Sequence, residues 1–447
     1  MTLTRAKRFA ISSGALVVAT ALALTGCAST SAPEKPSAGP VTLTFWHSAE
    51  GATAETLNTI VEDFNDAHKG KITVKATYQG KYDDTVAKLS ASVQAGDLPD
   101  LVQINDVNTA FMIDSGLIDP AQTLIKDAKV KYDFDALVPA VSSYYSVDGS
   151  LSSMPFQVSQ PALFVRNDVL AATATTPKTF PTTVSGLAKW AEKAKAATGK
   201  AGLTFHINPW WFEELTAGAG IEYCTPDNGR GSKPAKAFTI ADDTQVKQWT
   251  ELQKLFTDGA ALNVGTDFSA GVNALAAGQA GAFFSSSGAL GTVTTAMTTD
   301  WSVLPFPVEG KKGGVAPGGN SVFALKDSLK TDTERVAAAK FLAYLGSDKI
   351  QEQSFAATGF LPTTAPALKE SKSNANTRQT ALLNQLANTS DSIAAAGCLS
   401  GALQAVRGEL TPAMEKIVRG DDVKSTLTAV QKSASGLVAD YNERAGQ

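Results

Sequence analysis

The order of secondary-structure signals between residues 41 and 105 constrains the fold more than any other feature of this sequence. Residues 41–46, 71–78 and 101–105 are rich in β-branched and other apolar residues, which predicts three strands. Apolar side chains at helical spacing occupy the intervals, within residues 57–64 and 86–93, and predict one helix between each pair of strands. A strand–helix–strand–helix–strand order places parallel strands in one sheet, so the chain is predicted to have an α/β fold.

The rest of the chain continues with mixed strand and helix signals and is too long for a single core. Residues 162–166 and 319–325 predict further strands, residues 337–345 predict a helix, and residues 427–441 predict a final amphipathic helix. Roughly 420 residues follow the N-terminal signal described next, which exceeds what one compact core usually holds and predicts two or three domains.

The N-terminus has the composition of an export signal. Arg5, Lys7 and Arg8 precede an apolar run over residues 11–24, and small residues follow it. The run is too short to span a bilayer comfortably, so residues 1–26 are predicted to be a secretory signal peptide.

The end of this signal, Leu24-Thr25-Gly26-Cys27, resembles the lipobox of bacterial lipoproteins. The resemblance implies cleavage before Cys27 and acylation of its thiol, which would anchor the protein to the outside of the cell membrane. The alternative is an ordinary signal peptide with an incidental cysteine. Residues 27–40 are rich in Ser, Ala and Pro and are predicted to be a lipidated, flexible tether.

Charge and cysteine content narrow the class of the mature protein. Residues 1–26 hold three of the 39 basic residues and none of the 43 acidic ones, which leaves 36 against 43, a charge of −7. Such a surface disfavours nucleic acid and anionic lipid. Outside the cytoplasm the remaining pair, Cys224 and Cys398, favours a disulfide. Two buried thiols or a redox pair are the alternatives, although neither cysteine has a CxxC spacing.

Sequence patterns of common enzyme chemistries are absent. The three histidines, His47, His68 and His206, lie in no HExxH motif or Cys/His cluster, so neither a metal nor a cofactor is predicted. No GxSxG, P-loop or post-strand GxGxxG motif occurs. Glu213–Glu214 or Asp242–Asp243 could be proposed for a glycoside hydrolase, but adjacent acids on a helix do not face each other. Both acidic pairs are therefore interpreted as parts of solvated helix faces or as helix caps. The protein is predicted not to be an enzyme, and a secreted hydrolase is the alternative.

An ordered set of motifs from residue 41 to 440 resembles family 1 extracellular solute-binding proteins of carbohydrate ABC importers. The first motifs are Leu43-Thr44-Phe45-Trp46-His47 and Asp97-Leu98-Pro99-Asp100-Leu101-Val102. The others, which are similar to the glycerol-3-phosphate and glycerophosphodiester-binding branch, are Tyr78-Gln79-Gly80-Lys81-Tyr82, Met112-Ile113-Asp114-Ser115-Gly116, Met154-Pro155-Phe156, Ser285-Ser286-Ser287-Gly288, Gly318-Gly319 with Ser321, and Thr358-Gly359-Phe360-Leu361-Pro362.

The resemblance implies a two-lobed periplasmic-binding-protein-like fold of type II, with the ligand in a cleft between α/β lobes. The expected lobes are 41–155 plus 304–358 and 156–303 plus 359–447, with crossings near Met154–Phe156, Leu304–Pro307 and Gly359–Pro362. It also implies a monomeric extracytoplasmic receptor that closes around a glycerol-3-phosphate or glycerophosphodiester-type ligand and delivers it to the transmembrane permease of an ABC importer. An oligosaccharide receptor of the same fold is the closest alternative.

Four candidate ligand residues lie in the first half of the chain, and most have a structural alternative. Tyr82 matches the second tyrosine of the family's Tyr-x-Gly-x-Tyr segment, or is a solvent-facing helix start. Asp106 follows a predicted parallel strand and matches an acidic position of the family, or is an N-cap. Ser159 matches a serine at the family's second-lobe crossing, although Gln-Val-Ser-Gln replaces the usual Asn-Ser-Ser-Thr character. Trp210, or the adjacent Trp211, could stack on a sugar or a quaternary ammonium, or belongs to the core.

Four more candidates lie in the second half. Ser287 matches a family serine within a run predicted to start a helix, or only caps that helix. Gly319 allows the backbone to approach the ligand closely, or lies in a flexible loop over residues 313–319. Phe360 stands where the glycerophosphate receptors have tyrosine, which removes one polar contact. Arg407 matches the arginine that the family directs at the phosphate, or forms a surface salt bridge with a nearby acid.

Overall fold

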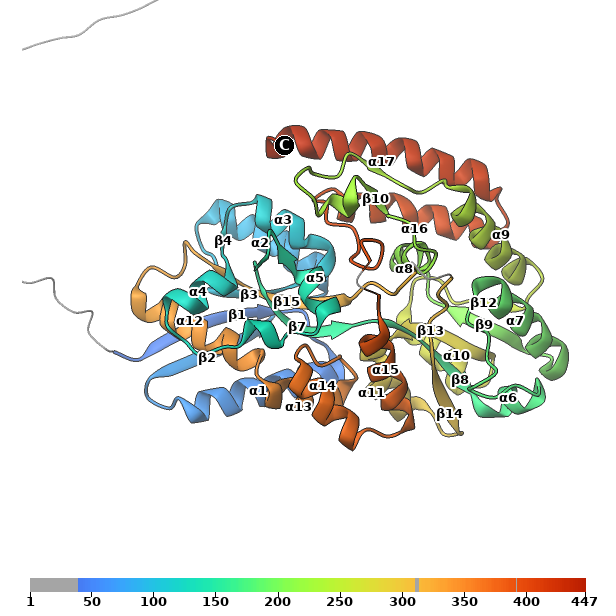
Figure 1. Ribbon diagram of the computed structural model, residues 1–447, viewed down its shortest axis with the longest axis horizontal. Coiled ribbons are helices and arrows are strands. Elements are labelled where there is room, and N and C mark those ends of the chain that lie inside the picture. The colour runs from blue at the N-terminus through green and yellow to red at the C-terminus, as the bar shows by residue number, and fades with distance from the viewer. Residues whose placement is uncertain (1–38, 310–312, 391) are drawn as a thin grey trace, which may run out of the picture. The chain divides into compact units, whose positions relative to one another are not determined.

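The computed structural model describes residues 39–309, 313–390 and 392–447 (Figure 1). The predicted signal peptide, Cys27 and residues 28–38 of the predicted tether lie outside these residues. A six-stranded sheet and a five-stranded sheet, each covered by helices, organise the described chain into two lobes, which confirms the α/β prediction.

The first lobe contains the strand–helix–strand–helix–strand segment that the sequence predicted. Its strands are β1 (Val41–His47), β2 (Ile72–Tyr78), β3 (Leu101–Asn105), β4 (Ile118–Asp119), β7 (Met154–Ser159) and β15 (Gly318–Leu325). They follow the order β2-β1-β3-β15-β4, and β7 pairs with β15. The predicted parallel pairing of β1 with β2 and β3 is confirmed, whereas β15 runs antiparallel between β3 and β4.

Helices with apolar stripes cover both faces of the first sheet. They are α1 (Gly51–Ala67), α2 (Tyr82–Ala95), α3 (Thr109–Asp114), α4 (Ala121–Asp127), α12 (Asp332–Leu345) and α13 (Asp348–Thr358). Phe341 of α12 packs edge to face on Phe64 of α1 at 5.0 Å and on Phe45 of β1 at 5.6 Å. Leu89 of α2 lies in a separate buried cluster with Val102 of β3, since successive strand residues point to opposite faces.

The second lobe is built on a mixed sheet. Its strands are β8 (Pro161–Arg166), β9 (Ala201–Phe205), β12 (Ala261–Asn263), β13 (Ala280–Ser286) and β14 (Trp301–Pro305). The order is β12-β9-β13-β8-β14, with β9 parallel to β12 and β13, and β8 antiparallel to β13 and β14. The helices of this lobe are α6 (Asn167–Ala172), α7 (Val184–Thr198), α8 (Trp210–Gly218), α9 (Asp243–Thr257), α10 (Phe268–Ala276), α11 (Leu290–Ala296), α15 (Thr377–Asn388), α16 (Leu403–Arg419) and α17 (Val423–Ala445).

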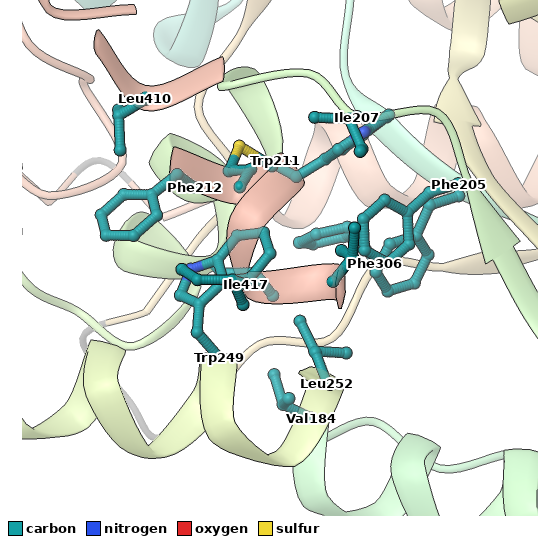
Figure 2. Close-up of a cluster of buried hydrophobic side chains, with 14 of the residues drawn as sticks. Val184, Phe205, Ile207, Trp211, Phe212, Trp249, Leu252, Phe306, Leu410 and Ile417 are labelled. Atoms are coloured by element: carbon teal, nitrogen blue, oxygen red, sulfur yellow. The ribbon is translucent and has the colours of Figure 1, made fainter. Parts of the chain in front are cut away.

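Figure 2 shows the aromatic core on which α8, α9 and α16 pack. The rings of Phe212 and Trp249 stack at 5.6 Å with an interplanar angle of 10°. Trp211 and Phe306 lie between these helices and the sheet, and Ile417 of α16 closes the cluster. Because this core fixes α8 and α16, it also fixes the polar side chains that these helices carry.

Shorter elements connect the lobes or extend them. They are α5 (Pro139–Tyr145), α14 (Ala365–Asn374), the strand pairs β5 (Ser146–Val147) with β6 (Ser150–Leu151) and β10 (Cys224–Thr225) with β11 (Ala237–Phe238), and the 3₁₀ turns η1 (Asp106–Asn108), η2 (Phe134–Ala136), η3 (Asp227–Gly229) and η4 (Ser287–Ala289). A disulfide joins Cys224 of β10 to Cys398, with the two Cα atoms 5.6 Å apart. The bridge ties the residues that precede α16 to the second lobe.

The chain passes between the two sheets three times. The first passage is at Gln160, between β7 and β8, and the second follows β14 and ends at β15. The third follows Gly359, where Leu361 forms a bridge to Val158 of β7. Met154–Phe156, expected to mark the first crossing, still belong to the first sheet, because Met154 and its neighbour pair with β15.

Among residues 39–309, 313–390 and 392–447, no helix combines the length and the apolar composition that crossing a bilayer requires.

Candidate functional site

Arg407 lies where the two lobes meet and contacts acidic residues of both. Its Nε donates to Oε1 of Glu213 at 2.6 Å and its Nη2 donates to Oε2 at 2.8 Å, which is a bidentate pair between α16 and α8. Its Nη2 is also 3.9 Å from Oδ2 of Asp106, which follows β3 in the first lobe. Tyr144 of α5 donates its hydroxyl to the same Asp106 oxygen at 2.7 Å. We call these four residues the Arg407 cluster.

Burial decides the electrostatics of the Arg407 cluster. The side chains of Arg407, Glu213 and Asp106 are only 15%, 13% and 10% exposed. Burial raises the pKa values of Asp106 and Glu213, and the Arg407 guanidinium offsets only part of that rise. Burial alone would lower the pKa of Arg407, but the two carboxylates outweigh it and raise that pKa. The arginine is therefore charged, and it balances two acids that solvent screens poorly.

A small cavity adjoins the Arg407 cluster on the second-lobe side. It is lined by Tyr144, Trp210, Glu213, Glu214, Ala217, Tyr223, Ala316, Pro317, Ala394, Gly397 and Cys398, and it is large enough for about one water molecule. Glu214 is fully buried, and its Oε2 accepts from the Ala316 N–H at 3.1 Å. Within the described residues its Oε1 and the Tyr223 hydroxyl have no hydrogen-bond partner. The cavity thus places two unsatisfied polar atoms beside Trp210.

The expectation that Glu213 and Glu214 lie on a solvated helix face or cap a helix is wrong, because both side chains are buried. Both are held in the interior by the aromatic core that buries Trp211 and Phe212 at the start of α8. They point to different partners, as adjacent helix residues do. Asp242, by contrast, caps α9 by accepting from the Thr244 N–H, as one of the alternatives predicted.

The two adjacent tryptophans have different surroundings. Trp211 is buried in the core and donates its Nε1–H to the His206 carbonyl at 2.7 Å. Trp210 is half-buried, and a Cβ added to Gly318 would lie 3.1 Å from its ring. Trp210 is therefore the tryptophan beside the Arg407 cluster.

Gly319 makes a close approach, but to protein backbone. Its φ is +98°, and an added Cβ would lie 2.2 Å from the Gln157 carbonyl oxygen in β7. Asn320, the next residue of β15, donates its Nδ2 to the hydroxyl of Tyr82 at 3.1 Å. Tyr82 begins α2 and is 37% exposed, so its ring is open to solvent while its hydroxyl is held by the first lobe.

Ser159 and Ser287 lie at the first passage between the lobes and are buried. Ser159 pairs with Gly318 across β7 and β15. The Ser287 hydroxyl accepts from the Gln160 N–H at 3.2 Å, and the Ser287 N–H donates to the Gln160 carbonyl at 2.8 Å. The capping of η4 expected of this serine run is performed by Ser286, which accepts from the Gly288 N–H.

The Phe360 ring packs against η4, the turn that begins at Ser287. A Cβ added to Gly288 would lie 2.7 Å from its ring, so the ring covers this turn. The structure therefore brings the eight candidates into two adjoining groups. The first contains Tyr82, Asp106, Trp210 and Arg407, and the second contains Ser159, Ser287, Gly319 and Phe360.

Reasoning from the sequence did not identify Glu213, Tyr144 and Asn320 as side chains that contact the candidate residues. Glu213 is 194 positions from Arg407, and no local pattern connects them. The one available signal was the aromatic run Trp210-Trp211-Phe212. A helix that is apolar on most of its faces is buried, and the acids next to such a run are then buried with it.

No group of three or more His, Cys, Asp or Glu side chains within the described ranges is arranged to hold a metal ion.

Comparison with known proteins identifies relatives along most of the chain. The sequence model of the family described as bacterial extracellular solute-binding protein matches residues 59–381. The sn-glycerol-3-phosphate-binding periplasmic protein UgpB of Escherichia coli K12 is 28% identical over 333 residues, which cover 73% of this chain and 75% of that protein.

Solved structures show the same fold at lower identity. UgpB from Mycobacterium tuberculosis in complex with glycerophosphocholine has a TM-score of 0.74 at 19% identity, covering 90% of this chain and 100% of that one. The GacH receptor of Streptomyces glaucescens, solved unliganded and with acarbose, also has a TM-score of 0.74 at 19% identity, covering 90% and 99%. The predicted two-lobed fold of periplasmic binding proteins is confirmed by these likenesses.

Proposed function

Because this chain belongs to the family of bacterial extracellular solute-binding proteins, we propose that it is the lipid-anchored receptor of an ABC importer for a glycerophosphodiester or glycerol-3-phosphate ligand. The receptor binds the ligand between its lobes without changing it chemically, and the closed form is presented to the permease. Cys27 carries the lipid, and the protein acts as a monomer outside the cytoplasm.

The observation that carries the choice of ligand is the state of Arg407. Glu213 engages its Nε and Nη2, and no hydrogen-bond acceptor for its Nη1 occurs among the described residues. A buried guanidinium held by one edge is pre-organised to bind a phosphoryl oxygen with the other. Arg407 also belongs to α16 of the second lobe while Asp106 belongs to the first, so a ligand here would contact both lobes.

The neighbouring side chains supply what the rest of such a ligand needs. The half-buried Trp210 offers an aromatic face to CH groups or to a quaternary ammonium. Asp106 and the Asn320–Tyr82 pair offer acceptors and donors for glycerol hydroxyls. The relatives are named for sn-glycerol-3-phosphate in one case and solved with glycerophosphocholine in another, which supports the same ligand class.

Contacts between the lobes support closure as the mechanism. Gln404 of α16 donates to Asp83 of α2 at 3.0 Å. Tyr441 of α17 and Gln447 both donate to Asp114 of α3, at 2.8 and 2.9 Å. A ligand that contacts both lobes favours the form in which these bonds exist, and it shifts the equilibrium only by its differential affinity for that form.

An oligosaccharide receptor is the second candidate. Phe360 lacks the hydroxyl that glycerophosphate receptors have at this position, and GacH, which shares the fold, was solved with acarbose. A secreted hydrolase would differ from both receptors by forming product during incubation, which mass spectrometry detects.

A thermal-shift screen tests the proposal. Glycerophosphocholine, sn-glycerol 3-phosphate, maltose and a longer oligosaccharide are compared, because a ligand that binds only the native state raises the melting temperature. The phosphate ligands are expected to raise it, and a response to saccharides alone would reject the glycerophosphate assignment.

Substitution of Arg407 then tests the phosphate contact. Arg407→Lys keeps a positive charge beside Glu213 but loses the planar guanidinium with its parallel N–H donors. The variant is expected to bind phosphate ligands about tenfold more weakly, which corresponds to about 1.4 kcal/mol. Arg419→Lys, at an exposed position on the same helix, is the matched control and is expected to leave affinity unchanged. Equal affinities in the Arg407→Lys variant and the wild type would show that this residue does not bind the phosphate.

A further inference from the structure

We propose that Glu213 is a specificity-determining residue of the Arg407 site, which favours a phosphodiester that carries its own positive charge over a dianionic phosphomonoester. The inference rests on the proposed function. It goes beyond that function by assigning the selection between phosphodiesters and phosphomonoesters to the Glu213 carboxylate, which contacts Arg407.

Glu213 occupies one edge of the Arg407 guanidinium. A phosphate that carries two or more free oxygens binds a guanidinium most strongly through the parallel N–H groups of one edge. In this protein the Nε–Nη2 edge of Arg407 is taken by the two oxygens of Glu213, at 2.6 and 2.8 Å. The phosphoryl group of either ligand is left with the Nη1–Nη2 end, where Nη2 already lies 3.9 Å from Oδ2 of Asp106, so its charge lies close to that carboxylate and to Glu213.

The charges of the side chains around Arg407 largely cancel. Arg407 is one positive charge in contact with two carboxylates, Glu213 at hydrogen-bond distance and Asp106 at 3.9 Å. Arg230 packs on Tyr144, with its guanidinium carbon 5.0 Å from the ring centroid, and its Nε and Nη1 donate to the carbonyls of Gly397, Ser143 and Tyr144. When the charge of Arg230 is counted, two cations stand against two carboxylates. The groups that face a ligand at Arg407 therefore sum to no excess of positive charge.

Phosphate ligands of different charge interact differently with such a site. A phosphomonoester carries a charge of about −1.5 to −2 near neutral pH, whereas a phosphodiester carries about −1. Repulsion by the partly buried Glu213 and Asp106 carboxylates is therefore greater for the monoester. A ligand with an ammonium group gains instead, because the same carboxylates and the face of the half-buried Trp210 attract a cation.

The experiment measures selectivity rather than affinity alone. Titration calorimetry gives the dissociation constants of sn-glycerol 3-phosphate and glycerophosphocholine for the wild type, Glu213→Gln and Glu213→Asp. Glu213→Gln keeps an oxygen for Arg407 but removes the charge, and is expected to improve the ratio in favour of glycerol 3-phosphate by about tenfold. Glu213→Asp keeps the charge and is expected to retain the wild-type ratio even if both affinities fall. Glu409→Gln removes one charge from an exposed position on α16 and is expected to leave the ratio unchanged.

The outcomes separate this inference from the proposed function. If the wild type binds a phosphate ligand but Glu213→Gln changes both affinities by the same factor, Glu213 is only structural and the inference is overturned while the function stands. If the wild type responds to saccharides alone, the proposed ligand class and the inference both fail. A shift of the ratio in Glu213→Gln but not in Glu213→Asp or Glu409→Gln supports the inference.

Discussion

Replacement of Glu214 by glutamine is predicted to change how the stability of the protein depends on pH. Glu214 is fully buried, its Oε2 accepts from the Ala316 N–H, and its Oε1 has no partner among the described residues. Burial, together with the charge of Glu213, raises the pKa of Glu214 well above its usual value. The folded protein therefore holds this carboxyl in its neutral form at a pH where the unfolded chain has already ionised it.

The sign and size of the effect follow from that difference. A carboxyl whose pKa is raised by folding contributes its full stability below the unfolded pKa, about 4.3, and that stability is lost as the pH rises toward the folded pKa. The loss is about 1.4 kcal/mol for each pH unit between the two values. In Glu214→Gln the amide oxygen accepts from Ala316 and the amide nitrogen replaces the acid O–H, so the hydrogen bond is kept while the titration is removed.

Urea unfolding of the two proteins across about pH 5 to 8 measures the difference. Asp106 and Glu213 also have raised pKa values, but both proteins contain them, so the difference between the two curves isolates Glu214. The free energy of unfolding of Glu214→Gln is expected to rise relative to the wild type as the pH increases. Glu62→Gln, at an exposed position on α1, is the control and is expected to give a curve parallel to the wild type. Parallel curves for Glu214→Gln would refute the assignment of a neutral buried acid.

Two further substitutions test the backbone and the contact between the lobes. Gly319→Ala is expected to lower the free energy of unfolding by about 3 kcal/mol or more, because φ is +98° and the new Cβ would meet a β7 carbonyl oxygen. Gly408→Ala, in open space on α16, is the control and should raise stability by about 0.5–1 kcal/mol, and similar denaturation midpoints for the two variants would contradict the reasoning. Tyr441→Phe removes the bond to Asp114 between α17 and α3, and calorimetry is expected to show an affinity about two- to tenfold weaker for the tightest ligand of the screen. An unchanged affinity with a lowered stability would mean that this bond does not distinguish the closed form.

The local part of the fold could be predicted from the sequence, whereas the pairing of distant segments could not. The strands at residues 41–46, 71–78 and 101–105 were recognised because each follows a local pattern of residue types. The strand near residues 319–325 was recognised too, but nothing in its composition says that it lies antiparallel between β3 and β4. Strand orientation depends on the path of the whole chain, which local periodicity does not encode.

In the candidate site, too, local features could be predicted from the sequence and the contacts between distant segments could not. Asp106 could be placed by reasoning, because the end of a parallel strand is where ligand residues gather. Arg407 was identified through the resemblance. It does form a salt bridge, with Glu213, but the pair is buried and is not the surface salt bridge of the alternative. The choice of Glu213 as partner depends on how α8 and α16 pack on the Trp249 core, which is a tertiary property. For Gly319, the sequence indicated a close approach, but only the structure shows that the approached group is β7.

The position of β15 has a consequence for how the protein is made. β3 ends at Asn105 and β15 begins at Gly318, yet the two are neighbours in the first sheet. A growing chain therefore exposes the unpaired edge of β3 until the ribosome has completed most of the polypeptide. The first lobe cannot finish folding early, although its strands are synthesised first. Interleaving of this kind delays the folded state of the first lobe until late in synthesis.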